Sequence, residues 1–194
     1  MSVKEFEVKV VTRSNIREFI ETHHYSHNIN GCIADYCFGL YRNSELIGAM
    51  FYGRLAMRNQ YKKYTDKESD IVELRRLVCV DDTPKNTESY FIGWTLRWLS
   101  KNTELKKVVS YADSNYGHSG IIYKASNFKY LGLSSKGRVI IFQDKKYHDK
   151  AIRTKYKGVL KPFAIELKKA LLTGEAVYAP QEGKHIYLYE LRRS

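Results

Sequence analysis

The stretch Lys107–Phe128, which reads KVVSYADSNYGHSGIIYKASNF, decides the fold. Its first part, up to Asp113, is an apolar run typical of a buried strand, and a glycine-containing turn then leads into a helix predicted over residues 116–126. Such an arrangement places Asp113 at the open end of a sheet, where it can act as a base or a metal ligand; Asp is also among the best residues for capping a helix. Tyr123, farther along the helix, can direct its hydroxyl to the same end as a general acid.

A similar strand and helix lie upstream. Residues 70–80 are mostly apolar and are expected to form a central strand, and the polar connection 81–87 leads to a helix that Asn86 or Thr87 can cap. The apolar side chains of that helix fall on one face: Phe91, Ile92, Thr95, Leu96 and Leu99.

The remaining elements complete an α/β, more specifically α+β, pattern. Residues 35–41 and 45–52 are expected to pair as a hairpin through the turn Arg42-Asn43-Ser44. The sequence further predicts a strand over 6–11, a helix capped by Ser14, strands over 128–131 and 139–142, a helix over 161–172 and a strand over 185–191. A hairpin followed by alternating strands and helices predicts a mixed sheet that is covered by helices and has parallel pairing at the crossover.

The composition is that of a globular domain. Hydrophobic residues make up 43% of the 194 and charged residues 28%, which argues against a disordered or fibrous chain. The apolar stretches are much shorter than the ~20 residues of a membrane span, and the first ten residues lack the apolar core of a secretion signal. We therefore expect one cytoplasmic domain over residues 1–194, with a basic C-terminal extension from about residue 145.

The cysteines indicate neither disulfides nor zinc. Cys32, Cys37 and Cys79 are odd in number and show no Cys-x-x-Cys spacing. Reduced, packed thiols are expected.

Positive charge is concentrated in two segments. Lys and Arg number 33 against 21 acidic residues, and the resulting net charge of +12 attracts polyanions. Half of this excess lies within residues 145–161, and a second cluster in residues 54–64 is interleaved with Tyr61 and Tyr64. Cations mixed with aromatic rings suit phosphates and bases, although either cluster alone is also typical of a solvated surface. The predicted nucleic-acid contacts are Arg54, Arg58, Lys62, Lys63, Lys145, Lys146, Lys150, Arg153, Lys155 and Lys157.

Three other motifs can carry chemistry. The segment His23-His24-Tyr25-Ser26-His27 follows the first helix and can supply a base, a proton shuttle or metal ligands, or only favourable charge at a helix C-terminus. Arg75 lies on the strand 70–80 and needs an anion, which is either Glu73 as an internal ion pair or a ligand. The helix start around Asn86, Thr87, Ser89 and Gly93 offers free backbone amides to a coenzyme phosphate.

Taken in order, these motifs resemble the Mom family of phage DNA-modification proteins, within the GNAT acyltransferase-like superfamily. The resemblance rests on His24-Tyr25-Ser26, Leu74-Arg75-Arg76-Leu77, Asn86-x-x-Ser89, Ser110-Tyr111-Ala112-Asp113, Gly117-His118-x-Gly120 and Tyr123, and it spans about residues 20–132. It implies a mixed, mostly antiparallel GNAT-like sheet with splayed central strands and helices on both faces. It also implies catalytic residues at His24, Tyr25, Arg75, Ser89, Asp113 and Tyr123, and an iron cofactor for which His24 and Asp113 are the candidate ligands.

The function implied by the resemblance is a carbamoylmethyl-type modification of the exocyclic amine of adenine in double-stranded DNA, which protects phage DNA from host restriction. A small-molecule donor is then required, and Asn86, Thr87 and Gly93 are its candidate contacts. One alternative is an acetyltransferase that uses acetyl-CoA or another acyl-CoA, but the sequence lacks the usual Gly-x-Gly/Ala phosphate loop. The other is a non-catalytic DNA-binding protein that blocks restriction.

Overall fold

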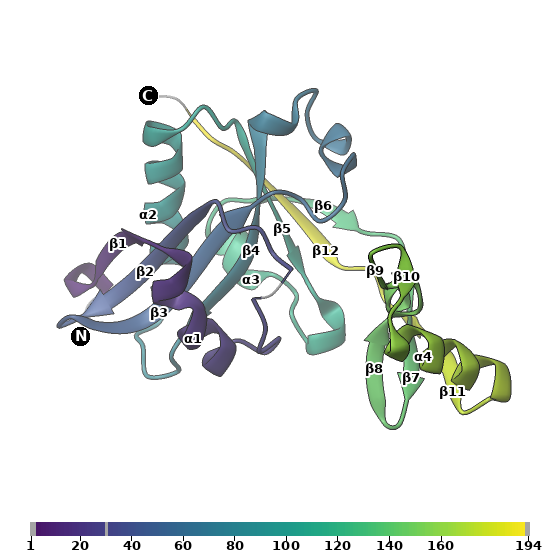
Figure 1. Cartoon of the computed structure of the whole chain (residues 1–194). Helices are drawn as coiled ribbons and strands as arrows, with labels where there is room; N and C mark the ends of the chain where they lie inside the picture. The colour runs from purple at the N-terminus through teal and green to yellow at the C-terminus, as the bar shows by residue number, and fades with distance from the viewer. Residues whose placement is uncertain (1–2, 30, 193–194) are drawn as a thin grey trace. The chain divides into compact units, whose positions relative to one another are not determined.

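The computed structural model describes residues 3–29 and 31–192, and it divides into two compact units. The first unit comprises Met1–Ala112, His118–Gly132 and His185–Ser194, and the second comprises Asp113–Gly117 and Leu133–Lys184. Both carry labelled elements in Figure 1. That the units function as one domain stays a prediction.

A seven-stranded sheet organises the first unit. Its strand order is β1-β2-β3-β4-β5-β12-β6. Pairing is antiparallel between β1 and β2, β2 and β3, β3 and β4, and β5 and β12, whereas β4 and β5 are parallel. The strands span Glu7–Val11 (β1), Tyr36–Arg42 (β2), Glu45–Gly53 (β3), Ile71–Cys79 (β4), Lys107–Ala112 (β5), Lys129–Leu133 (β6) and His185–Glu190 (β12). The predicted mixed, mostly antiparallel sheet is confirmed.

Helices cover both faces of this sheet because side chains alternate along its strands. Helix α1 (Arg13–His23) buries Ile16 and Ile20 in a cluster with Cys37, Ala49 and Phe51. The alternate residues of the same strands, Phe38, Leu40 and Met50, pack in a second cluster with the buried face of α2 (Thr87–Asn102). The expected helical face of α2 is therefore confirmed, and so are helices on both faces.

Local predictions in the first unit hold with two corrections. The β2–β3 hairpin turns at Asn43 and Ser44, whose φ values are 49° and 69°. The helix expected over 116–126 is only the short α3 (Ile121–Ala125), because left-handed Gly117 and Gly120 (φ 76° each) interrupt the segment. Thr12, rather than Ser14, occupies the N-cap position of α1.

The second unit contains a three-stranded sheet in the order β11-β7-β8. The strands span Gly137–Phe142 (β7), Lys145–His148 (β8) and Ala176–Gln181 (β11), and α4 (Pro162–Thr173) contributes to their core. A separate hairpin pairs β9 (Lys155–Tyr156) with β10 (Val159–Leu160). Residues 145–184 of the expected basic extension lie in this unit, whereas β12 (His185–Glu190) belongs to the sheet of the first unit.

Short 3-10 helices complete the chain at Val3–Glu5, Gln60–Lys63, Glu68–Asp70, Ser114–Tyr116 and Asp149–Arg153. All three cysteines are free thiols. Among the described residues, the helices are too short or too polar to cross a bilayer.

Candidate active site

The two parallel strands of the first unit separate partway along their length. β4 and β5 pair only from Ile71 with Lys107 to Leu74 with Ser110, although β4 continues to Cys79 and β5 to Ala112. We call this region, beyond Leu74 and Ser110, the strand gap. It confirms the splayed central strands, and open α/β sheets bind ligands at such a position.

A β-bulge places Arg75 at the strand gap. Phe51 pairs with Arg76 and Tyr52 with Leu74, so Arg75 is the extra residue on β4. Its guanidinium donates to the backbone oxygen of Arg54 at 2.9 Å and lies 3.3 Å from a carboxylate oxygen of Glu73. Both side chains are only 13% exposed, so this is the internal ion pair that the sequence left open. The buried Nε of Arg75 has no hydrogen-bond partner among the described residues.

His24 ends α1 as a buried and neutral imidazole. It is 6% exposed, and its Nδ1 accepts the backbone N–H of Ser26 at 3.1 Å. Because Nδ1 is an acceptor, the proton of the neutral ring is on Nε2. Burial, helped by the positive charge of Arg76, lowers the pKa of His24 to about 4. At neutral pH His24 is therefore a hydrogen-bond donor through Nε2 and not an imidazolium acid.

Two more rings join His24. The centroids of His24 and Tyr25 lie 4.2 Å apart, and those of Tyr25 and His118 lie 4.8 Å apart. His118 belongs to the loop after β5, and the sequence pattern pointed to it only as part of the motif Gly117-His118-x-Gly120. Its position against Tyr25 makes it a site residue that sequence reasoning missed, and the Gly117-His118-x-Gly120 pattern was the available signal.

Tyr123 brings a phenol to the same neighbourhood. Its side chain is 9% exposed and lies against Tyr187, with ring centroids 5.3 Å apart. Burial raises the pKa of Tyr123 to about 12; a hydrogen bond with Ser110 acts in the opposite direction, while nearby Tyr25 and Glu73 raise it further. Tyr123 therefore keeps its proton at neutral pH and can serve as a donor.

A second phenol cluster was not foreseen. The Tyr111 hydroxyl lies 2.7 Å from that of Tyr64 and accepts a 2.6 Å hydrogen bond from the Gln60 side chain. Burial raises the pKa of both tyrosines, and Glu73 raises both further. These bonds anchor the basic segment 54–64 to β5, beside the strand gap.

With this geometry established, comparison with known proteins decides the family. The profile of the Mom protein family matches residues 5–194, nearly the whole chain. The chain belongs to the Mom protein family.

One curated relative of this Mom-family protein is methylcarbamoylase mom from Escherichia phage Mu. The two are 30% identical over 134 residues, which is 66% of this chain and 54% of the relative. The match thus spans about half the length of that relative.

Solved structures agree on the fold. A probable acetyltransferase from Staphylococcus epidermidis gives a TM-score of 0.54 at 10% identity, covering 96% of this chain and 99% of that chain. A variant of spermidine N-acetyltransferase from Vibrio cholerae gives 0.54 at 11% identity, covering 97% and 95%. The Mom-family chain therefore has a GNAT-like fold, as expected.

Asp113 of this Mom-family protein belongs to the second unit and is already engaged there. Its carboxylate accepts bonds from the Lys184 ammonium at 2.8 Å and from the Asn115 backbone and side chain at 3.1 and 2.8 Å. Burial would raise the pKa of Asp113, but the bonds with Lys184 and Asn115 outweigh it and hold the pKa below its ordinary value. Asp113 is ionised and caps the turn that follows, the alternative that its sequence position had left open.

The start of α2 offers less to a cofactor than the sequence suggested. Thr87 is fully buried, and its hydroxyl donates to the Pro84 carbonyl, so it is not presented to a ligand. The Ser89 hydroxyl donates to the backbone oxygen of Asn86, and Gly93 lies inside the helix rather than in a loop. The exposed connection that precedes α2 carries Asp81 and Asp82. Asp82 is paired with Arg42 at 3.3 Å and Lys85 beside the helix start is exposed, so donor contacts at Asn86, Thr87 and Gly93 stay a prediction.

The described residues also fail to fit the iron implied by the family resemblance. Within 3–29 and 31–192, no three His, Cys, Asp or Glu side chains gather in a way that could hold a metal ion. Of the two candidate ligands, His24 accepts the Ser26 backbone N–H at Nδ1 and Asp113 is paired with Lys184. No chemistry is assigned to a metal.

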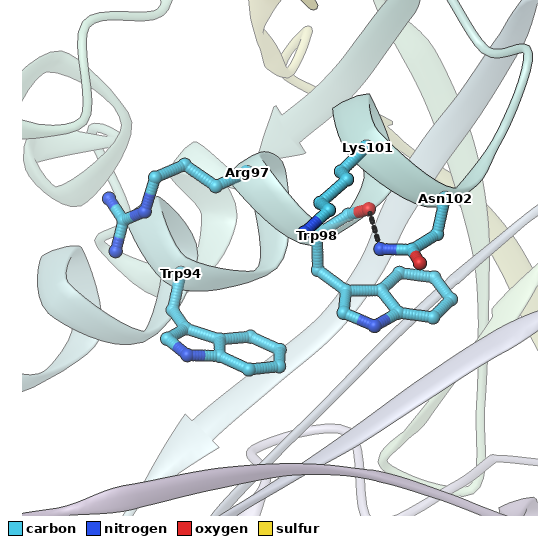
Figure 2. Close-up of a pocket in the computed structure, with 5 residues that line it drawn as sticks. All are labelled: Trp94, Arg97, Trp98, Lys101 and Asn102. Atoms are coloured by element: carbon cyan, nitrogen blue, oxygen red, sulfur yellow. Dashed lines mark hydrogen bonds between the residues drawn. The ribbon is translucent and has the colours of Figure 1, made fainter.

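A hollow of about 370 Å³ lies along α2 (Figure 2). It is lined by Trp94, Arg97, Trp98, Lys101 and Asn102. None of these belongs to the strand gap or to the predicted site, so the hollow is separate from the candidate active site.

The predicted nucleic-acid contacts are all exposed. In the first unit they are Arg54, Arg58, Lys62 and Lys63, and in the second Lys145, Lys146, Lys150, Arg153, Lys155 and Lys157. Exposure leaves each set available to a polyanion.

Proposed function

We propose that this Mom-family protein transfers a carbamoylmethyl-type group to the exocyclic amine of adenine in double-stranded DNA. The single observation that carries the proposal is the convergence of neutral His24, Tyr25 and protonated Tyr123 in the unit where β4 and β5 separate. The name of the phage Mu relative, methylcarbamoylase, supports the class of group transferred.

The reaction forms a bond between the adenine nitrogen and the methylene carbon of the group. The bond between that carbon and the donor's leaving atom breaks, the leaving atom keeps the electron pair, and the proton that the nitrogen loses passes to water. We assign Tyr123 as a hydrogen-bond donor to the leaving atom, because burial raises its pKa to about 12 and the phenol keeps its proton at neutral pH. The Nε2–H of His24 can orient a carbonyl oxygen of the transferred group.

Adenine in a duplex must leave the base stack before its amine can enter a buried site. The tyrosine-bearing basic segment 54–64 and the cations of the second unit supply phosphate contacts for this substrate. Arg75, Ser89 and Asp113 stay predicted contributors, and the donor is a small molecule that carries a carbamoylmethyl group on a leaving atom. In a cell infected by phage, the reaction would take place on DNA in the cytoplasm and shield it from restriction.

The test is mass spectrometry of nucleosides from the DNA of cells expressing the protein. The wild-type chain should give deoxyadenosine shifted by one carbamoylmethyl group, and Tyr123→Phe should reduce this product about 100-fold, the contribution of one preorganised hydrogen-bond donor. Tyr90→Phe is the matched control, since it removes a phenol that donates to the Phe6 carbonyl away from the strand gap. Unaltered deoxyadenosine with well-expressed wild-type protein would refute the proposal.

A further inference from the structure

The hairpin β9–β10 of the second unit exposes an apolar tip. Tyr156 pairs with Val159 across the ribbon and Leu160 with Lys155. Tyr156 is 66% exposed and Val159 69% exposed, although both are large hydrophobic residues. Directly paired residues on antiparallel strands project from the same face, so Tyr156 and Val159 together form one exposed apolar pair.

The tip is stiffened by its turn. Lys157 and Gly158 are the two residues between the strands, and both adopt positive φ, 48° and 82°. Two consecutive left-handed residues are typical of the tight hairpin turn that matches strand twist. The base of the ribbon is closed by a 2.9 Å bond from the Lys161 backbone N–H to the Thr154 carbonyl. The apolar pair is therefore held on a short, ordered support.

Exposed cations lie on and beside the hairpin. Lys155, Lys157 and Lys161 are exposed on or beside the hairpin, and Lys157 lies over the Tyr156 ring at 5.6 Å. No carboxylate within 4.0 Å pairs with these three lysines among the described residues, whereas Arg153 just upstream pairs with Asp149 at 3.0 Å. An exposed apolar pair on a lysine-rich hairpin complements a partner with apolar planes between anionic strands, which is the chemistry of stacked DNA bases.

We propose that the β9–β10 hairpin is a wedge whose Tyr156 and Val159 side chains insert between base pairs of duplex DNA and unstack the target base. The inference rests on the proposed function. It assigns to the hairpin the role of helping the target adenine to leave the base stack. Inserted apolar side chains partly unstack base steps in other DNA-bending proteins. The surrounding lysines bind the phosphates on either side of the inserted pair.

Unstacking is measured with a duplex that carries 2-aminopurine in place of adenine, because its fluorescence rises when the base leaves the stack. The wild-type chain should raise the fluorescence, and the double variant Tyr156→Ala with Val159→Ala should reduce that rise about tenfold at saturating protein. Leu172→Ala is the matched control, since Leu172 is an apolar side chain of the same unit that is 88% exposed. Thermal unfolding of the variants checks that each remains folded.

A second measurement separates the wedge from affinity. Modification in fully paired DNA is compared with modification of an adenine placed in an unpaired bubble, where no unstacking is needed. The double variant should lose activity on paired DNA and keep it on the bubble. Equal losses on both substrates, or an undiminished fluorescence rise, would overturn the wedge. Failure of the proposed function looks different: wild-type protein then unstacks the probe but modifies neither DNA.

Discussion

Two histidines, one in each unit, make the same local bond in different surroundings. His24 accepts the backbone N–H of Ser26 at Nδ1 (3.1 Å), and His148 accepts that of Lys150 at Nδ1 (3.0 Å). His24 is buried beside Tyr25 near the strand gap, whereas His148 is exposed among cations and next to Asp149. The region around the strand gap of the first unit thus gathers buried groups whose protonation is fixed, whereas residues 145–161 of the second unit display solvated charge. A fixed, dry environment suits bond-making, and solvated charge suits attraction of a polyanion.

The sharpest test of this contrast replaces the two histidines in turn. His24→Ala should lower DNA modification about 100-fold or more, because a preorganised donor is removed from the site. His148→Ala removes an equivalent turn bond and should leave modification within about twofold. Nucleoside mass spectrometry measures both. Equal effects of the two variants would show that the loss comes from the turn and not from the site.

Loss of the buried ion pair in the first unit should lower the free energy of unfolding more than loss of an exposed ion pair in the second unit. Arg75→Met leaves Glu73 buried without its cation and should lower the free energy of unfolding by ~3 kcal/mol. Arg153→Met removes an arginine that is 64% exposed and should change it by less than about 1 kcal/mol. Urea unfolding gives both values. Combining Glu73→Gln with Arg75→Met should recover much of the loss, and a double variant as unstable as Arg75→Met alone would argue against the buried pair.

Exposed charge should control affinity and its dependence on salt. Replacing Lys145, Lys146 and Lys150 by Gln should lower DNA affinity about tenfold and reduce the log–log salt slope by ~2–3, since each phosphate contact contributes ~0.9. Binding to a labelled duplex at several salt concentrations measures this slope. His24→Ala should leave this slope unchanged. A reduced slope in that variant would mean that His24 also affects phosphate binding, against the separate roles given to the two regions.

The last prediction concerns stability at mildly acid pH. His24 has a folded pKa of about 4 against an ordinary 6.5, so the folded state binds fewer protons than the unfolded state between these values. This contribution to the free energy of unfolding is fully present above pH 6.5 and is lost as the pH falls toward 4. His24→Gln should therefore reduce the difference in urea midpoint between about pH 7 and about pH 4.5. An unchanged difference would mean that His24 is not buried in its neutral form.

The sequence predicted the sheet of the first unit well because its strands are apolar and long enough to show a pattern. It could not show the β-bulge at Arg75, which depends on pairing with β3. It also predicted too long a helix after Asp113, because the sequence does not show that Gly117 and Gly120 adopt the left-handed conformation that interrupts the helix. Tyr64 and Tyr111 meet across 47 positions, a contact that no local pattern encodes.

The second unit was harder to predict from sequence. Its strands β8, β9 and β10 are two to four residues long and rich in lysine, so residues 145–161 show charge but no strand periodicity. The charge of this stretch was enough to predict correctly that the candidate DNA contacts are exposed. The hairpin that carries Tyr156 requires knowledge of the turn at Lys157 and Gly158, whose left-handed conformation is plain only in the structure.

The position of β12 in the sheet affects how the chain must fold. β12 (His185–Glu190) lies between β5 and β6, although the whole segment Leu133–Lys184 is synthesised before it. During translation, one edge of β5 therefore has to wait unpaired until His185–Glu190 leaves the ribosome. Exposed edges of this kind invite pairing with other chains. Shortening the delay by circular permutation, or supplying β12 as a separate peptide to a truncated chain, would show how far the yield of folded protein depends on this late insertion.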